Sequence, residues 1–341
     1  MLDLGTHWKP VRRMLGAAMW MAAICLPHSG NAQVSRLEVT PLQSVTLSDQ
    51  EFLIGREDGK PVVIAGELRL PGFGAGRRPL VILLHGSGGP GWGVVDWEQK
   101  FLDMGVATFV LDSFTGRGIV DTTNDQAQLG RLTQTVDAYR ALALLSRHPR
   151  IDPHRIMLIG FSRGGQNALY ASLKRFQRMH LTSTTPPFAA YVAFYPDCSY
   201  TYRDDEELAP APVRIFHGTA DTFSRSSTCR AYVQRLRAKG QDIQITEYPG
   251  AQHVFDSRIL QQPIALPQAQ STRNCQTIES EEGKLVSATT RQPFSYADAC
   301  VERGATMAYD EQAATEAEKA VRKLVTEMLK PLSPALLNKL P

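Results

Sequence analysis

The chain has 341 residues, of which 43% are hydrophobic and 21% charged, a composition typical of a globular protein with one large core. This balance excludes a disordered chain and a fibre. Lys and Arg together exceed Asp and Glu by three, and no basic run of the nucleic-acid-binding kind occurs, so no nucleic-acid partner is expected. A small molecule is the expected substrate.

The first 32 residues have the pattern of a cleaved secretory signal peptide. Two arginines precede an apolar run from Met14 to Leu26, and small residues follow at 29–32. An uncleaved anchor is the alternative, but this run is short for a bilayer core of roughly 30 Å. We therefore expect residues 33–341 to form a periplasmic or secreted protein without a stable membrane anchor.

Strand and helix patterns alternate along most of the remaining chain. Short apolar runs bounded by turn residues predict strands, and apolar residues at helical spacing predict helices. The expected strands are 37–47 and 62–70, as an opening antiparallel pair, and then 80–84, 106–111, 156–159, 189–194, 213–216 and 243–248. The expected helices are 97–104, 132–145, 166–174, 225–238 and 311–329. The alternation predicts an α/β fold with a mostly parallel, doubly wound sheet and helices on both faces.

One stretch, 257–307, does not follow this alternation. It is polar, contains two cysteines and is longer than an ordinary loop. We expect it to be a disulfide-tied insertion beside the mouth of the site, within a single domain spanning 33–341.

Four cysteines remain after the predicted signal, and an even number in an exported chain indicates two disulfides. Four cysteines permit three pairings. We favour Cys198 with Cys229, which would join loops leaving neighbouring strands, and Cys275 with Cys300, which would close a loop with little core of its own. Free buried thiols are the alternative.

The motif Gly160-Phe161-Ser162-Arg163-Gly164 lies between a predicted strand and a predicted helix. In that context G-x-S-x-G is typical of a nucleophile elbow, a turn so tight that the positions two before and two after the serine need small residues. The glycines at 160, 164 and 165 meet this demand. Ser162 is therefore the predicted nucleophile, with a merely structural turn as the alternative.

A serine nucleophile needs a base beside it and an acid that orients the base. Asp221 and His253 each lie five residues beyond a predicted strand, and the carboxyl ends of parallel strands meet at one edge of a sheet. We predict His253 as general base and Asp221 as its partner. Asp197 also follows a strand and is the alternative acid, whereas His85 and His217 are expected to tie down their own loops.

Backbone N–H groups placed near the nucleophile stabilise the negative charge of a tetrahedral intermediate. The expected donors are those of Arg163, directly after the nucleophile, and of Ser87 in the glycine-rich loop 86–91, with Gly88 as the alternative to Ser87. No Cys/His cluster has zinc spacing, and neither a metal nor a cofactor is expected.

Five blocks of the sequence resemble the α/β-hydrolase superfamily, and within it the dienelactone hydrolase family. They are 83–89, 111–118, 160–165, 217–221 and 253–255, in the family's order. The resemblance implies hydrolysis of an ester or lactone through an acyl-enzyme, without metal or organic cofactor. Dienelactone hydrolases proper use cysteine where this chain has Ser162, which favours a general carboxylesterase over hydrolysis of the dienelactone itself.

Two other functions stay open from the sequence. One is a peptidase related to prolyl oligopeptidase, although nothing here resembles its propeller domain. The other is a non-catalytic binding protein on the same fold. Arg117 and Arg163 could recognise an acidic substrate, but loop-pinning or solvated arginines are the favoured interpretation.

Overall fold

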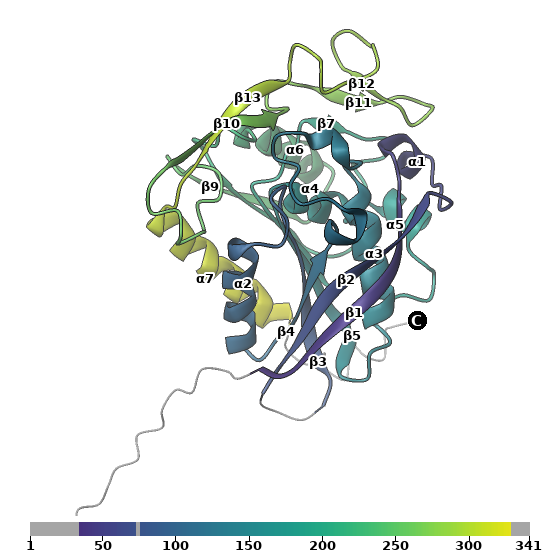
Figure 1. Cartoon of the computed structure of the whole chain (residues 1–341), viewed down its shortest axis with the longest axis vertical. Coiled ribbons are helices and arrows are strands. Elements are labelled where there is room, and N and C mark those ends of the chain that lie inside the picture. The colour runs from purple at the N-terminus through teal and green to yellow at the C-terminus, as the bar shows by residue number, and fades with distance from the viewer. Residues whose placement is uncertain (1–33, 73–75, 329–341) are drawn as a thin grey trace, which may run out of the picture. The chain divides into compact units, whose positions relative to one another are not determined.

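A computed structural model of the chain describes residues 34–72 and 76–328 (Figure 1). The predicted signal peptide, 1–32, and the last residue of the final predicted helix, Leu329, lie outside the described residues.

The described residues are organised around an eight-stranded sheet with the order β1-β2-β4-β3-β5-β6-β8-β9. Its strands are β1 (Val34–Thr46), β2 (Lys60–Pro71), β3 (Arg78–Leu84), β4 (Ala107–Asp112), β5 (Ile151–Phe161), β6 (Ala190–Phe194), β8 (Val213–Gly218) and β9 (Ile243–Tyr248). β1 pairs antiparallel with β2, and β2 with β4, while all other neighbours are parallel. The predicted α/β class, the opening antiparallel pair and the mostly parallel sheet are confirmed.

Both faces of the sheet are covered by helices, which explains why the central strands are continuous apolar runs. In β3, Leu80, Ile82 and Leu84 enter one buried cluster, while Val81 and Leu83 enter the other. The first cluster includes residues of α3 (Thr133–Leu145), α4 (Arg163–Tyr170), α5 (Lys174–His180) and α6 (Ser226–Ala238). The second includes residues of α2 (Trp92–Asp103) and α7 (Glu311–Met328), which lie together on the other face (Figure 1).

The helix expected over 166–174 is wrong as a single element. It is divided into α4 and α5, separated by Ala171, Ser172 and Leu173. The break is held by tertiary pairing, since the N–H of Ala209 donates to the carbonyl of Ser172 at 2.7 Å and Leu173 forms a β-bridge with Leu208. Residues far along the chain here take hydrogen bonds that a continuous helix would have used, and the local sequence pattern does not reveal this.

Several short elements were not predicted. They are α1 (Asp49–Leu53), β7 (Tyr200–Thr201) and the 3₁₀ turns η1 (Thr115–Arg117) and η2 (Gln126–Gln128). Helix α1 begins with a capping box in which Ser48 and Glu51 satisfy each other's backbone N–H groups. A Ser followed three residues later by Glu is the sequence signal that identifies this start.

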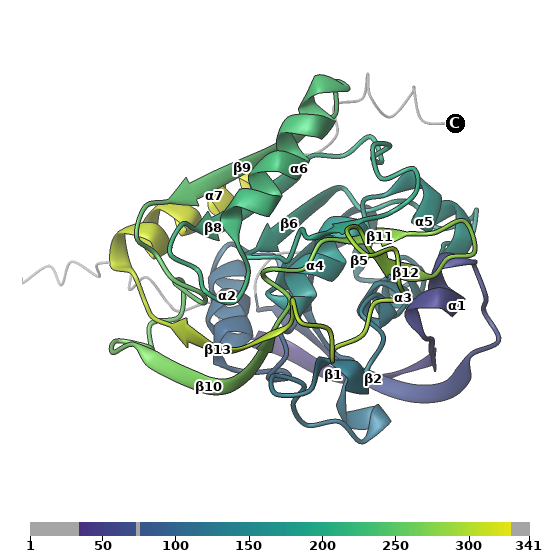
Figure 2. The same cartoon turned by 90° about the horizontal axis from the view of Figure 1, so that it is seen from above.

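The segment 257–307 is more regular than the loop expected from its composition. It contains β10 (Ile264–Ser271), β11 (Thr277–Glu279), β12 (Leu285–Ser287) and β13 (Glu302–Met307). β10 pairs with β13, and β11 pairs with both β12 and β7. In Figure 1 these strands lie along the top of the described structure, and Figure 2, seen from above, shows β11 and β12 near α5 and apart from the pair β10 and β13.

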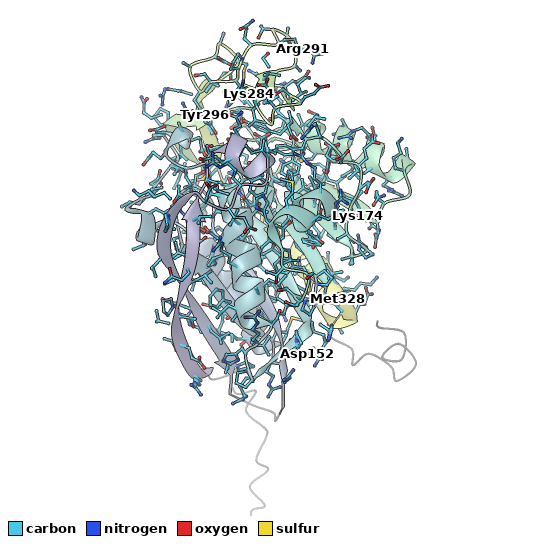
Figure 3. The ribbon with its side chains drawn as sticks, turned by 90° about the vertical axis from the view of Figure 1, so that its right-hand side faces the viewer. Asp152, Lys174, Lys284, Arg291, Tyr296 and Met328 are labelled. Carbon is cyan, nitrogen blue, oxygen red and sulfur yellow. A yellow bond between two sulfur atoms is a disulfide. The ribbon has the colours of Figure 1, made fainter. Side chains whose placement is uncertain are left out.

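This segment lies at the carboxyl ends of the parallel strands. In Figure 3 the labelled Lys284, Arg291 and Tyr296 are at one end of the described structure, while Asp152, near the start of β5, is at the other. The position places the segment at the edge where functional residues of such sheets gather.

Two disulfides occur, Cys198 with Cys229 and Cys275 with Cys300, with Cα atoms 4.9 Å apart in each. These are the pairings that the sequence favoured. The first ties the loop after β6 to α6, and the second closes the segment 257–307 on itself.

Candidate active site

Ser162 occupies a sharp turn between β5 and α4. Its backbone has φ 54° and ψ −115°, a conformation that costs a non-glycine residue roughly 1–3 kcal/mol. Added Cβ atoms on Gly160 and Gly164 would lie 2.0 Å from the carbonyl oxygen of Gly164 and 2.4 Å from that of Leu84. The turn therefore needs glycine at both positions, and it presents the serine side chain at the end of β5.

His253 lies next to Ser162 and Asp221. Its Nε2 is 2.9 Å from Ser162 Oγ, and its Nδ1 is 2.7 Å from Asp221 Oδ2. The three residues come from loops after β5, β8 and β9, whose carboxyl ends share one edge of the sheet. With Nδ1–H donating to the carboxylate, Nε2 is free to accept the serine proton.

The Asp221 carboxylate is fully buried yet suited to stay charged. Its Oδ1 accepts the backbone N–H groups of Phe223, at 2.7 Å, and Ser224, at 2.9 Å. Burial alone raises the pKa of Asp221, but His253, His217 and these hydrogen bonds outweigh it and hold the pKa below its ordinary value. The acid is thus an anion over the physiological range, as the orienting role requires.

Two aromatic rings contact the imidazole of His253. Phe223 stacks on it with ring centroids 4.9 Å apart, and the Tyr195 ring lies 4.6 Å away. Tyr195 has φ 38°, and its hydroxyl donates to Asp256 Oδ1 at 2.9 Å. The sequence interpretation missed both rings, although Phe223 stands only two residues after the predicted acid.

The alternative acid, Asp197, and the carboxylate of Asp256, three residues after His253, both bond to groups other than the imidazole. Asp197 accepts hydrogen bonds from the Ser199 N–H and the Thr272 hydroxyl, and Asp256 accepts them from Trp97 Nε1 and Tyr195. Asp256 is buried, which raises its pKa despite these donors. Neither carboxylate has a hydrogen bond to the imidazole in the described part of the chain.

His85 and His217 lie beside the backbone of their own loops. His85 Nδ1 is 2.8 Å from the Gly86 carbonyl, while its Nε2 accepts the N–H of Ser113 at 3.2 Å. The two nitrogens of His217 face the carbonyls of Gly218 and Pro196. Burial lowers the pKa of both side chains, to about 4 for His85, so both are neutral at physiological pH.

The glycine-rich loop after β3 passes directly beside the serine. A Cβ on Gly86 would lie 3.3 Å from Ser162 Cβ, and Ser87 follows it into the cavity that Ser162 lines. Arg163 is the first residue of α4, so its N–H lies outside the helical hydrogen-bond ladder. The predicted oxyanion-hole residues, Ser87 and Arg163, thus flank the serine from two loops.

The two arginines considered for an acidic substrate are held inside the protein. Arg163 donates to the carbonyls of Leu129 and Gly130 and to both oxygens of Gln126. Arg117 forms a two-point ion pair with Asp137, at 2.8 and 2.9 Å. Both side chains pin loops, which is the interpretation favoured from the sequence.

Two cavities meet at Ser162. The larger, of about 450 Å³, also includes His253 and is walled by the glycine-rich loop and by apolar residues of the segment 257–307, namely Ile259, Leu260, Leu266 and Met307. The smaller, of about 20 Å³, is lined by polar side chains, among them Gln126, Arg131, Gln166 and Thr272. These polar residues were not predicted from the sequence. The one local pattern that marks any of them is the position of Arg131, between Gly130 and a predicted helix.

Among residues 34–72 and 76–328, no group of three or more His, Cys, Asp or Glu side chains is arranged to hold a metal ion. The same residues include no helix both long and apolar enough to cross a membrane.

The fold and the serine turn are those of the α/β-hydrolases. The model of the dienelactone hydrolase family matches residues 71–279, more than half of the chain, and the chain belongs to this family. It is therefore a hydrolase of the esterase and lactonase type.

Individual relatives are more distant. A protein of Bradyrhizobium sp., described as a probable 2-oxo-3-(5-oxofuran-2-ylidene)propanoate lactonase, is 24% identical over 213 residues, which cover 57% of this chain and 81% of the relative. A putative dienelactone hydrolase from Klebsiella pneumoniae is 16% identical with a TM-score of 0.55, over 85% of this chain and 99% of that one. The dienelactone hydrolase-like promiscuous phosphotriesterase P91, from metagenomic libraries, is 17% identical with a TM-score of 0.55, over 86% of this chain and 99% of that one. At these identities the two solved structures show a shared fold.

Proposed function

We propose that the protein is an exported serine hydrolase that cleaves esters or lactones of small molecules through an acyl-enzyme. Ser162 is the nucleophile, His253 the general base and then acid, and Asp221 the residue that orients the imidazole. The observation that carries the proposal is the continuous hydrogen-bond relay from Ser162 Oγ through the imidazole to Asp221, at 2.9 and 2.7 Å.

In the first half of the reaction, His253 Nε2 takes the proton of Ser162 Oγ while the oxygen bonds to the substrate carbonyl carbon. The carbonyl oxygen becomes an anion, which the N–H groups of Arg163 and Ser87 stabilise by about 3 kcal/mol each. The intermediate collapses, the imidazolium gives its proton to the leaving alkoxide, and the acyl group stays on the serine.

In the second half, a water molecule replaces the alcohol. His253 removes a proton from the water, whose oxygen adds to the acyl carbon, and the imidazolium returns a proton to Ser162 Oγ as the acid leaves. In a lactone the leaving alkoxide remains joined to the acyl group, so one product results.

Export rests on two features. The first 32 residues have the pattern of a signal peptide, and the remaining cysteines form two disulfides, a usage typical of oxidising compartments. We propose that residues 33–341 act as one domain in the periplasm or outside the cell.

The test is hydrolysis of p-nitrophenyl acetate by oxidised residues 33–341. Ser162→Ala should abolish turnover, and Asp221→Asn should lower kcat by about 10⁴-fold because it leaves His253 in the wrong tautomer. Asp197→Asn tests the alternative acid, because this carboxylate also follows a strand but bonds Thr272 instead of the imidazole, and we expect a far smaller loss of kcat than with Asp221→Asn.

Labelling by a fluorophosphonate completes the test. Parent protein that is labelled at Ser162 and hydrolyses the ester supports the proposal. Parent protein that is neither labelled nor active favours a non-catalytic binding protein, and faster cleavage of peptide anilides than of esters favours a peptidase.

A further inference from the structure

The two cavities at Ser162 have unequal access to the imidazole. His253 lines the larger one but not the smaller one, while Ser87, Ser162 and Phe223 line both. In the proposed function, His253 gives its proton to the leaving oxygen, so the leaving group has to lie on the imidazole side. The acyl group is then left to face the smaller cavity, which Ser162 lines and His253 does not.

The smaller cavity is surrounded by hydrogen-bond donors. The side chains of Arg131, Arg163 and Gln166 line it, and these residues are only 6%, 5% and 1% exposed. In the described structure, Arg131 Nε, Arg163 Nε and Gln166 Nε2 are buried without an acceptor. An unpaired buried donor costs about 1–3 kcal/mol, so such a site favours a ligand that brings an acceptor and no donor.

The two arginine side chains at this cavity already interact with other groups of the protein. Arg131 lies 3.6 Å from Asp197 and stacks over the Tyr200 ring at 4.3 Å, and the Arg163 guanidinium is engaged by backbone carbonyls. Asp197 itself lines the cavity, so a second carboxylate would meet a like charge there. The donors therefore suit a neutral oxygen better than an anion.

The size of the cavity limits the acyl group. A volume of about 20 Å³ accommodates one or two atoms the size of a water oxygen, so only the outer atoms of a short acyl chain enter this cavity. The larger cavity, in contrast, offers about 450 Å³ with walls that include Val94, Phe161, Leu260 and Leu266. Its apolar lining fits a bulkier apolar alcohol or phenol.

We infer that the enzyme prefers esters of short alkoxy- or oxo-substituted acids, whose neutral oxygen accepts hydrogen bonds from Arg131 and Gln166, while an apolar leaving group fills the larger cavity. This inference rests on the proposed function and names its substrate class. Arg131 and Gln166 then determine specificity for the acyl group, and take no part in proton transfer.

The test compares p-nitrophenyl methoxyacetate with p-nitrophenyl butyrate. The two esters have the same leaving group and the same number of heavy atoms, and an ether oxygen replaces one methylene of the acyl chain. Each kcat/KM is divided by the rate constant of hydroxide-catalysed hydrolysis, which removes the difference in intrinsic reactivity. We expect the normalised ratio to favour methoxyacetate at least tenfold in the parent.

Substitutions at the smaller cavity test whether its residues cause the preference for methoxyacetate. Gln166→Glu keeps an acceptor for Arg131 Nη1, 2.8 Å away in the parent, but replaces the unpaired amide donor by an oxygen, so the ratio should fall at least fivefold. Arg131→Met should lower it further. Arg235→Met is the control, because Arg235 pairs with Asp205 and lines neither cavity, and it should keep the parent ratio.

Other outcomes overturn the inference. A ratio near one in a parent that is labelled by fluorophosphonate and hydrolyses p-nitrophenyl acetate means that the small cavity only holds water, and leaves the proposed function intact. A higher normalised rate with mono-p-nitrophenyl malonate than with methoxyacetate means that the site recognises an anion. A preference for p-nitrophenyl octanoate over butyrate shows that the acyl chain enters the larger cavity instead.

Discussion

The ring of Phe223 stacks on the imidazole of His253, with 19° between the two planes and 4.9 Å between the centroids. The contact fixes the imidazole plane in which the relay atoms lie. Phe223→Ala removes an aromatic contact worth about 0.5–1.5 kcal/mol, so kcat/KM for p-nitrophenyl acetate should fall about twofold to tenfold. The backbone N–H that position 223 donates to Asp221 is unaffected by the substitution.

Steady-state kinetics checks this prediction, with Phe223→Tyr as the control that keeps a ring at the position and should stay close to the parent. Equal kcat/KM in the parent and in Phe223→Ala would show that the stacking does not position the base.

Acid should destabilise the protein partly through His85. Burial lowers the pKa of this imidazole from an ordinary 6.5 to about 4, so between these values the unfolded chain binds a proton that the folded protein excludes. Stability is therefore complete above pH 6.5 and falls as the pH decreases toward 4. The loss amounts to about 3 kcal/mol, at 1.36 kcal/mol for each pH unit.

Urea unfolding at pH 7 and pH 4.5 measures this loss. His85→Gln, which can still donate to Gly86 and accept from Ser113, should show a smaller pH dependence than the parent. The exposed His154 provides the control, since His154→Gln should keep the parent slope. The same slope in all three proteins would contradict the assignment.

The serine turn should not tolerate a methyl group at Gly160. Its Cβ would stand 2.0 Å from the Gly164 carbonyl oxygen, a backbone atom that can move only if the turn opens. We expect Gly160→Ala to lower the free energy of unfolding by more than about 3 kcal/mol and to abolish ester hydrolysis. Gly93→Ala in α2, where a Cβ meets nothing within 4 Å, is the control for the unfolding measurement. Calorimetry that found the same Tm for Gly160→Ala and the parent would exclude the steric argument.

The Cys275–Cys300 disulfide should matter for both stability and substrate binding. The two cysteines are 25 residues apart, and a disulfide across such a loop raises the free energy of unfolding by about 3–4 kcal/mol in the chain-entropy model. Because Thr272, Leu266 and Met307 of the same segment line the cavities, the double variant Cys275→Ser/Cys300→Ser should also raise KM for p-nitrophenyl acetate. Urea unfolding and steady-state kinetics measure the two effects. Unchanged stability and KM in the double variant would mean that strand pairing alone holds the segment.

Much of the fold followed from apolar runs, because each buried parallel strand is hydrophobic on both faces. Strand β6, for example, is buried throughout, and its residues, Ala190–Phe194, lie within the expected 189–194. Since parallel strands end at a common edge, the loops carrying Asp221 and His253 could be brought together without knowing any distance.

The polar residues that line the smaller cavity at Ser162 could not be predicted in this way. Arg131 reaches the serine's cavity because α3 packs on α4, where the N–H and hydroxyl of Thr135 both bond Asn167, and this packing has no signature in the sequence. The break between α4 and α5 has the same origin, since it depends on Leu208 and Ala209, which lie more than thirty residues further along the chain.

The segment 257–307 leaves and rejoins the sheet domain at almost the same point. Met307 forms a β-bridge with His253, and the N–H of Ala308 donates to the carbonyl of His253. A stretch whose two ends meet can be exchanged for one of another length without moving β9 or α7. Replacing residues 258–306 by the corresponding stretch of a relative keeps Asp256 and Met307, and would give a chimera with new substrate walls around an unchanged hydrogen-bond relay. Evolution could diversify the enzyme by the same route.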